Sequence, residues 1–504
     1  MTEKITQMRD VKAIRWTALI LLSFAMFFSY IFMDILSPIQ SMLESTRGWD
    51  SVSYGNYAGS ETFLNVFIFF LIFAGIILDK MGVRFTAILA GIVMLVGASI
   101  NWYAVTEAFT GTGLHDWFTN NLNFPHPENQ PWNITPFFGE GIDKLGNILP
   151  AMPASAKFSA VGFMIFGCGV EMAGITVSRG IVKWFRGKEM ALAMGTEMAL
   201  ARIGVASVMI LSPWVANMFG KPDVSRSVAF GVILLIIALI MFIVYFFMDK
   251  KLDAQTGEAE EKDDPFKISD IGKILTSRGF WLVALLCVLY YSAIFPFQKY
   301  AVNMLQCNLG FTEKTAGTIF AVFPLLAAAI TPFLGNFIDK KGKAATMLIM
   351  GALLMIVCHL TFALILPQFK PVGDEVPVLG TIIAIITILV LGASFSLVPA
   401  SLWPSVPKLV DSKVIGSAYA LIFWIQNIGL WLFPMLIGRI LRASNQDIVN
   451  NESLSAAQKS VMYDYTNPLL MLACLGIAAF FLAFVLKAWD KKKGYGLELP
   501  NIKK

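Results

Sequence analysis

Charged residues are scarce in this sequence: they make up 14% of its 504 residues, whereas 57% are hydrophobic. A soluble domain cannot bury that much apolar surface, so the chain must be solvated by a bilayer. Its three histidines and five cysteines show no spacing typical of a metal site or a disulfide framework. Nucleophile motifs and phosphate-binding loops are also missing. We therefore expect no enzyme activity, no metal and no cofactor.

Hydrophobic runs of about 20 residues, the length that spans a bilayer, recur along the whole chain. We predict twelve transmembrane helices, at residues 16–43, 55–78, 84–106, 158–182, 190–215, 227–248, 279–305, 313–338, 343–367, 377–402, 413–441 and 464–488. The first run is too long for a cleaved signal peptide, so it is expected to stay as a helix. The predicted fold class is an all-α membrane protein of two six-helix bundles.

The basic residues indicate an orientation. With the N-terminus in the cytoplasm, 26 Lys and Arg residues lie in cytoplasmic segments, nine in external ones and four inside helices. This distribution follows the positive-inside rule, and it predicts that both termini are cytoplasmic. The net charge of +5 then reflects membrane orientation, and nucleic acid is not an expected partner.

A charged stretch divides the chain into two related halves. Residues 249–278 have the composition of a cytoplasmic linker between a bundle at 1–248 and a bundle at 279–504. Pro38-Ile39-Gln40 has a counterpart in Pro296-Phe297-Gln298, near the outer ends of the first and seventh helices. Parallel six-helix repeats of this kind place a substrate site near the midplane, between the halves.

A second repeated motif lies at the cytoplasmic turns. The sequence GIILDKMGVR, with Gly75, Asp79, Lys80 and Gly82, recurs as GNFIDKKGK, with Gly335, Asp339, Lys340 and Gly342. It resembles the loop signature of the major facilitator superfamily, except that Val83 stands where a basic residue is usual. Glycine permits a tight turn, and an Asp at a helix end can cap it or pair across the bundle. We predict a gating contact here that breaks when the halves rock, with Arg84 taking the role of the missing basic residue.

Two opposite charges are expected at one depth in the membrane. Glu171 lies 12 residues before the cytoplasmic turn that starts at Lys183, and Arg202 lies 13 residues after that turn ends at Glu189. At 1.5 Å per residue, both lie roughly 18–20 Å from the cytoplasmic edge, on adjacent antiparallel helices. Charges at this depth are costly unless they are paired or face water. The two form either a permanent ion pair or a split dipolar binding site.

Other charges fall nearer the membrane faces. Asp34, Glu61 and Lys299 lie in the outer parts of their helices, where they could close an external gate or, for the two acids, bind a proton; simple interfacial charges are the alternative. Glu197 is expected either to pair with Arg179 or to face cytoplasmic water.

Longer stretches resemble one branch of the superfamily. The stretch 166–205, FGCGVEMAGITVSRGIVKWFRGKEMALAMGTEMALARIGV, contains Glu171 and Arg202, and it is joined by LGASFSLVPASLWPSVPKLV, by GSAYALIFWIQNIGL and by the first helix. These stretches resemble the family called major facilitator superfamily domain-containing protein one, the lysosomal dipeptide transporter and its relatives. They cover about a quarter of the chain directly.

This resemblance implies dipeptide transport by alternating access, with Glu171 contacting the peptide ammonium and Arg202 its carboxylate. The termini of an extended dipeptide are roughly 6–7 Å apart, and Arg suits a bidentate carboxylate contact. Recognition of the termini alone would give broad selectivity. The expected substrate-binding set is Glu171, Arg202, Lys299, Trp403, Gln426 and Asn427, with Asp34 and Glu61 as candidate proton sites.

Alternatives stay open. An organic-anion carrier would use Arg202 and Lys299, and Glu171 would oppose it. A non-transporting receptor on the same fold is a second alternative. The loop at 107–157 is about fifty residues long, and the N-terminal tail has no acidic dileucine signal. We therefore expect a bacterial inner membrane rather than a lysosome, and an accessory subunit only in a eukaryotic protein. Coupling to protons, substrate identity and homodimer formation are not decided by the sequence.

Overall fold

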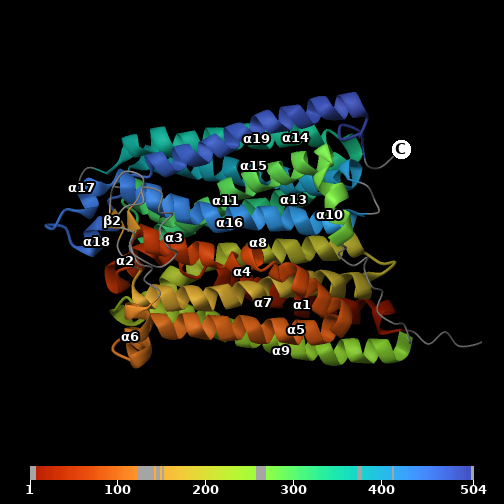
Figure 1. Cartoon of the computed structure of the whole chain (residues 1–504), viewed down its shortest axis with the longest axis horizontal. Helices are drawn as coiled ribbons and strands as arrows, with labels where there is room; N and C mark the ends of the chain where they lie inside the picture. The colour runs from red at the N-terminus through yellow and green to blue at the C-terminus, as the bar shows by residue number, and fades with distance from the viewer. Residues whose placement is uncertain are drawn as a thin grey trace, which may run out of the picture.

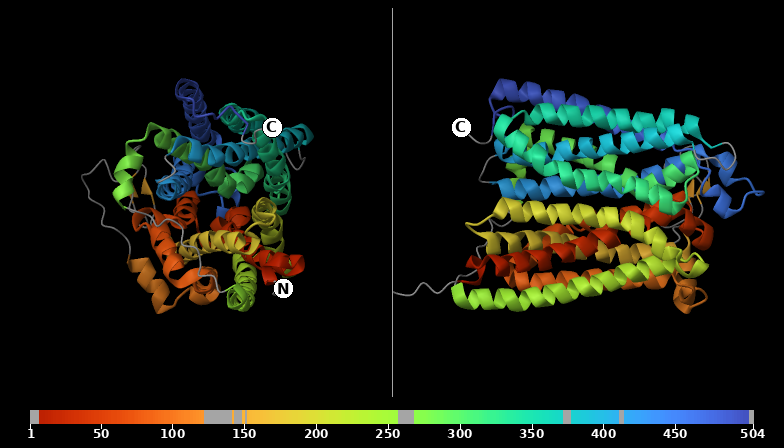
Figure 2. Two further views of the ribbon diagram at one scale, coloured as in Figure 1. Left: turned by 90° about the vertical axis from the view of Figure 1, so that its right-hand side faces the viewer. Right: turned by 180° about the vertical axis from the view of Figure 1, so that it is seen from behind.

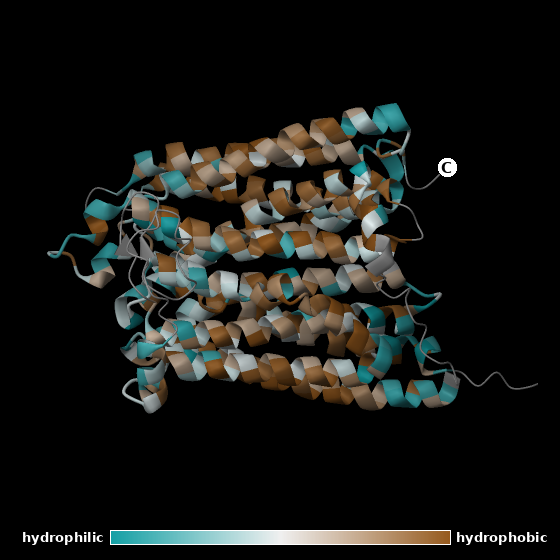
Figure 3. Ribbon diagram, in the orientation of Figure 1, coloured by the Kyte–Doolittle hydropathy of each residue, from teal (hydrophilic) through white to brown (hydrophobic). Residues whose placement is uncertain are grey.

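Long helices, all roughly parallel to one axis, make up the described part of the chain (Figure 1). The structure is a computed structural model, and it describes residues 7–121, 141–142, 148–149, 152–256, 268–371, 377–410 and 414–500. The middles of the helices are apolar and the ends polar (Figure 3). Eleven helical segments of the described chain are long and apolar enough to cross a membrane. The internal hydrogen bonds of a helix satisfy its backbone in lipid, which is why these runs fold as helices.

The helices form two groups, which the end-on view separates (Figure 2). The long helices of the first group are α1 (Lys12–Met33), α5 (Phe70–Val105), α7 (Ala154–Phe185), α8 (Met190–Ala216) and α9 (Val224–Thr256). Those of the second are α11 (Arg278–Leu309), α13 (Val322–Lys341), α14 (Ala344–Leu360), α15 (Val378–Leu409), α16 (Ile415–Ser444) and α19 (Thr466–Lys493). We call these groups the first half and the second half.

Shorter elements lie at the two ends of the bundle. The termini end carries η1 (Met8–Asp10), α10 (Ile268–Leu275) and the end of α19, whereas α6 (Gly113–Asn120), α17 (Gln446–Val449) and α18 (Ala456–Lys459) mark the opposite, loop end (Figure 1). The remaining short elements are η2 (Ser37–Ile39), α2 (Gln40–Arg47), α3 (Ser51–Ser60), α4 (Phe63–Phe67), η3 (Glu107–Phe109), β1 (Gly141–Ile142), β2 (Ile148–Leu149), η4 (Met218–Gly220), α12 (Glu313–Phe320), η5 (Thr361–Ile365) and η6 (Leu366–Phe369). β1 and β2 pair antiparallel.

The second crossing is not one continuous helix, which corrects the predicted span at 55–78. It consists of α3, α4 and the first part of α5, with breaks at Glu61–Thr62 and at Phe69, whose φ is 55°. Inside α5, Gly82 has a φ of 77° and a ψ of 168°, so the chain reverses there and returns as the third crossing. A left-handed φ suits glycine because it has no Cβ. With the reversal at Gly82 counted, the eleven spans of the described residues and this broken helix give the twelve predicted crossings.

Other boundaries also differ from the predicted ones. The first helix ends at Met33, and α2 continues the crossing to Arg47. The sixth helix runs to Thr256, past the predicted end at 248. The first residues of the predicted linker are therefore helical. The centre of the predicted linker and about half of the loop at 107–157 lie outside the described residues.

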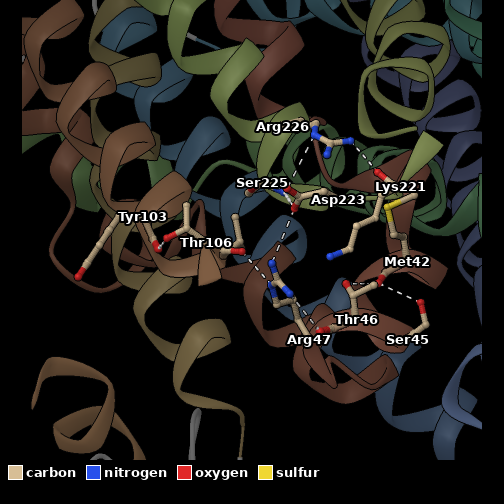
Figure 4. A network of polar contacts seen from close by, with 11 residues as sticks. Met42, Ser45, Thr46, Arg47, Tyr103, Thr106, Lys221, Asp223, Ser225 and Arg226 are labelled. Carbon is tan, nitrogen blue, oxygen red and sulfur yellow. Dashed lines mark hydrogen bonds and ion pairs between the residues drawn. The ribbon is translucent and has the colours of Figure 1, made fainter. Parts of the chain in front are cut away.

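Close contacts join the two halves at the loop end. There α3 packs on α16, and α8 packs on α12 and α13. A Cβ on Gly438 would collide with the Ser51 carbonyl oxygen, so only glycine allows α3 and α16 to approach this closely. Within the first half, Arg47 at the end of α2 donates to the Val105 carbonyl over 2.8 Å and lies 3.7 Å from Asp223 (Figure 4). These contacts hold the loop ends of three crossings of the first half together.

Candidate functional site

A cavity of about 1520 Å³ lies between the two halves. At the level of Glu61 and Lys299 it is bounded by the contacts that join the halves, and it reaches Arg9 and Arg186 at the termini end. Pockets of 300–1,000 Å³ already hold drug-sized ligands, so there is ample room for a small molecule and water.

Ion pairs and hydrogen bonds between the halves close the loop end. Arg442 of α16 pairs with Asp50, the N-cap of α3, at 2.6 Å. Tyr463 of the second half donates a hydrogen bond to Glu44 of α2. Ser41 donates to Glu313 of α12 over 3.0 Å. Such contacts must break if the cavity is to open at this end.

A buried charge cluster forms the end wall of the cavity. The Lys299 ammonium of α11 lies 2.9 Å from Asp34 and 3.5 Å from Glu61, and it donates to the Met33 carbonyl over 2.9 Å. Asp34 also accepts from Gln298 over 2.7 Å. The exposed fractions of Asp34 and Lys299 are only 1% and 8%. Lys299 thus lines the cavity, but two carboxylates of the other half already neutralise it.

The break in the second crossing brings polar backbone into the same region. Val66 and Thr62 lie where the helix is interrupted, and carbonyls at such breaks lose their helical partners. The Trp424 indole donates to the Val66 carbonyl over 2.9 Å, and its ring stacks on Phe69 with centroids 5.2 Å apart. Side chains of α16 therefore stabilise a broken helix of the other half.

Glu171 and Arg202 both line the cavity. Glu171 lies 14 residues before the end of α7 and Arg202 12 residues after the start of α8, which corresponds to about 21 Å and 18 Å along the helices. Neither residue makes a salt bridge within the described parts of the chain. The permanent ion pair is thus not formed in this structure, and both charges face the cavity.

Each of the two charges has polar or aromatic neighbours from the other half. The Asn427 side chain of α16 lies within interaction range of the Glu171 carboxylate. The Arg202 guanidinium lies 4.2 Å from the ring centroid of Phe395 of α15, a favourable cation–π contact. The hydroxyl of Tyr291 also lies within electrostatic range of Arg202. The site therefore draws on both halves.

The other predicted binding residues lie around this pair. Trp403 and Gln426 line the cavity together with Asn427. The Trp403 indole donates to the Tyr291 hydroxyl over 2.9 Å, and Gln426 accepts from the Cys287 thiol at 3.4 Å. Contact of any of them with a substrate stays a prediction. The sequence did not single out Tyr30, Tyr291 or Phe395, because many aromatic residues occur and none of their spacings marks a cavity.

The first signature turn makes its observed contacts within its own half. Asp79 pairs with Arg179 of α7 at 2.7 Å, and Arg84 pairs with Asp253 of α9 at 2.9 Å. Arg179 therefore pairs with Asp79, not with Glu197 as one prediction had it. Gly75 and Asp79 line the cavity, and Lys80 and Gly82 follow them in α5.

The second signature turn is held by the end of the chain. Gly342, with a φ of 73°, closes α13 after Gly335, Asp339 and Lys340. The backbone amide of Ala344 donates to the Leu497 carbonyl over 3.0 Å, and Thr346 donates to the Glu498 carboxylate through both its amide and its hydroxyl. The gating role of both turns stays a prediction.

The turn between α7 and α8 is fixed by two further ion pairs. Arg15 of α1 lies 2.8 Å from Glu189, and Lys188 lies 2.9 Å from Asp10. Hydrogen bonding to Arg15 lowers the pKa of the Glu189 carboxyl, and hydrogen bonding to Lys188 lowers the pKa of Asp10. This turn separates the helices that carry Glu171 and Arg202, so its position sets their relative depth.

The family model of the Major Facilitator Superfamily matches residues 145–434. The chain belongs to this superfamily. It is a multi-pass membrane protein, and the predicted resemblance to this superfamily is confirmed. The lysosomal dipeptide transporter MFSD1 of Danio rerio is 30% identical over 292 residues, covering 56% of this chain and 59% of the relative. The protein of the same name from Homo sapiens is 27% identical over 311 residues, covering 60% and 62%. The chain thus spans about three fifths of these relatives' length.

Solved structures share the fold at low sequence identity. The nucleoside transporter NupG superposes with a TM-score of 0.63 at 13% identity, covering 94% of this chain and 99% of that one. A structure on substrate recognition in proton dependent oligopeptide transporters gives a TM-score of 0.60 at 13% identity, covering 94% and 99%. A bacterial homologue of the human lysosomal transporter Spinster, inward-facing and occupied, gives 0.60 at 13%, covering 96% and 98%. These likenesses concern the fold alone, and with them the predicted twelve-helix fold is confirmed.

Proposed function

We propose that this protein transports dipeptides across a membrane by alternating access. The observation that carries the proposal is the placement of Glu171 and Arg202 on the wall of one cavity, at similar depth, with neither neutralised by a salt bridge within the described residues. A zwitterionic dipeptide supplies the two missing partners. Its ammonium suits the carboxylate and its carboxylate suits the guanidinium, which can bind it with two parallel hydrogen bonds. Trp403, Gln426 and Asn427 would complete the binding surface.

The orientation and the state of the molecule belong to the same proposal. We assign the termini end to the cytoplasm, as the positive-inside rule predicts. The cavity then opens inward, and the contacts of Asp50–Arg442 and of Asp34–Lys299 form the external gate. Residues 1–248 and 279–504 would rock as two units about the site, joined by residues 249–278. We propose a bacterial inner membrane, although the relatives named above are lysosomal.

We propose that Lys299 serves in the external gate, one of the two roles that the sequence allowed, and not in substrate binding. Because Asp34 and Glu61 hold its ammonium, substrate carboxylate binding falls to Arg202 alone. The Asp34–Glu61 pair retains its proposed capacity to bind a proton, since protonation of either acid would loosen the hold on Lys299. In proton symport, Asp34 or Glu61 would take up and release a proton in every transport cycle. In uniport, neither acid would need to.

A flux assay tests the proposal. Purified protein in liposomes should take up a labelled dipeptide such as Leu-Ala, and excess unlabelled dipeptide should compete. Glu171→Gln and Arg202→Ala should each abolish uptake while the protein remains monodisperse in detergent. Glu452→Gln, an exposed carboxyl-to-amide change, is the matched control. Exchange of dicarboxylates without dipeptide uptake would favour the organic-anion carrier, and tight binding without flux would favour a receptor.

A further inference from the structure

The two parts of the broken second crossing are held differently. On the loop-end side of the break, α3 is fixed to α16, because a Cβ on Gly55 or on Gly59 would collide with a carbonyl oxygen of that helix. On the termini-end side, Ile72 and Ile76 in the first turns of α5 line the cavity. The short helix α4 therefore joins a part that cannot move against α16 to a part that forms the cavity wall.

The Trp424 indole takes the place of a backbone donor at this break. In a continuous helix, the Val66 carbonyl would accept a hydrogen bond from the amide of Phe70, four residues later. The left-handed φ of 55° at Phe69 interrupts that pattern, and the indole donates to the Val66 carbonyl over 2.9 Å instead. Because lipid offers no donor to a free carbonyl, a break at membrane depth needs such a partner.

The broken form also contains a strained residue. A bulky side chain rarely adopts a left-handed φ, because its Cβ then crowds the following carbonyl oxygen. The Phe69 ring stacks on the Trp424 ring with centroids 5.2 Å apart, so the same side chain offsets part of the strain. A broken and a continuous second crossing thus differ by one exchanged hydrogen bond and one strained residue.

Both ends of α4 are connected to parts that act in transport. Glu61, beside its start, lies 3.5 Å from the Lys299 ammonium of the proposed external gate. The Thr62 hydroxyl donates to the Asn427 carbonyl over 3.4 Å. Asn427 lines the cavity and lies three residues after Trp424 on α16. A change at the binding site can therefore reach the break through one helix.

We infer that Trp424 is a positioning residue for the change between the two open states. Its indole keeps the second crossing broken while the cavity is open at the termini end, and it releases Val66 to the Phe70 amide when that end closes. Closing the break changes the direction of α5 against α3 and so moves the cavity wall. This inference rests on the alternating access of the proposed function, and it does not depend on the identity of the substrate.

Two cysteine reporters measure which state the protein occupies. Ser51→Cys lies at the closed loop end, where Ser51 is 1% exposed, and Ile76→Cys lies on the cavity wall, where Ile76 is 43% exposed. Each is introduced separately into a Cys474→Ser background, because the other four native cysteines are buried. The ratio of their labelling rates with a water-soluble maleimide, Ser51→Cys over Ile76→Cys, follows the equilibrium between the two states.

Two variants should shift this ratio in opposite directions. Trp424→Phe keeps an aromatic ring against Phe69 and removes the donor, so the ratio should rise roughly fivefold, the effect of one neutral hydrogen bond. Phe69→Gly relieves the strain of the broken form, so the ratio should fall. Trp431→Phe is the matched control: this indole of α16 packs edge-on against Phe67, and its N–H has no hydrogen-bond partner within the described residues. It should leave the ratio unchanged.

The opposite signs separate a hinge from simple packing. An unchanged ratio in Trp424→Phe, or a shift of the same sign in Trp424→Phe and Phe69→Gly, overturns the inference. If one of these variants does not fold, an unchanged ratio or a shift of the wrong sign in the other still overturns it. Unchanged ratios together with dipeptide uptake by the wild-type protein refute the hinge and leave the proposed function intact. The expected shifts without dipeptide uptake support the hinge and refute the dipeptide as substrate.

Discussion

The Lys299 ammonium lies 2.9 Å from the Asp34 carboxylate, and the two residues come from different halves of the molecule. Their helices, α11 and α1, occupy corresponding places in the two bundles. The pair is nearly inaccessible, with exposed fractions of 8% and 1%. A buried ion pair across an interface costs desolvation, and removal of one partner leaves the other uncompensated. The contact therefore makes closure of the loop end sensitive to single charges.

Lys299→Met should destabilise the protein strongly. It leaves Asp34 and Glu61 facing each other without a cation, and breaking a buried pair typically costs about 3–5 kcal/mol. Thermal unfolding in detergent measures the loss. Lys314→Met, at an exposed site, is the control and should leave the midpoint unchanged. The double variant Asp34→Asn/Lys299→Met should recover part of the loss, and failure to recover any would speak against the pairing.

Arg442→Gln should favour the state that is open at the loop end. It removes the 2.6 Å contact with Asp50 that joins α16 to α3. A cysteine placed at Ser51, which is 1% exposed, should then react several-fold faster with an impermeant maleimide. The background is Cys474→Ser, because the other four native cysteines are buried. An unchanged labelling rate would mean that other contacts alone hold this end shut.

Arg202→Lys should weaken dipeptide binding even though it keeps the charge. Lysine loses the planar contact with the Phe395 ring, 4.2 Å away, and the two parallel hydrogen bonds to a carboxylate. We expect affinity to fall roughly tenfold, the effect of one charge-assisted hydrogen bond. Isothermal titration measures it. Wild-type affinity would show that only the charge of Arg202 matters.

The Glu189–Arg15 contact should stabilise the protein at neutral pH and lose its effect in acid. The folded protein lowers the pKa of Glu189 below its ordinary value of 4.5. A depressed carboxyl pKa contributes stability that is present above the unfolded pKa and is lost as the pH falls through the folded pKa. Glu189→Gln should therefore lower the unfolding midpoint at pH 7, and the difference should shrink at a pH below 4.5. A constant difference at both pH values would point to packing instead of charge.

The shared depth of Glu171 and Arg202 could be predicted because depth along a helix follows directly from residue spacing. Glu171 and Arg202 are counted from one shared turn, so their common depth could be predicted before any packing was known. Rotation about the helix axes could not be predicted in the same way. For that reason the sequence allowed a pair between Glu197 and Arg179, whereas in the structure Arg179 pairs with Asp79 of α5.

Features that depend on contacts between the two halves could not be predicted from the sequence. The break at Phe69 carries no proline or glycine to mark it, and it is accompanied by Trp424 and other α16 side chains far along the chain. Phe395 is one of 41 phenylalanines, and only the packing of α15 on the cavity sets it over Arg202. Tertiary contacts of this kind override local signals.

The repeated signature turns are fastened by different means, and this limits how alike the two halves can behave. Ion pairs between side chains fix the Asp79 turn. At the Gly342 turn, hydrogen bonds to the Leu497 carbonyl and to the Glu498 carboxylate fix the start of α14. The two turns thus share a sequence motif but differ in the contacts that hold them. High ionic strength or a single charge reversal can loosen the Asp79 turn and leave the Gly342 turn intact. The two halves therefore need not move at the same moment of the transport cycle, even though their folds are alike.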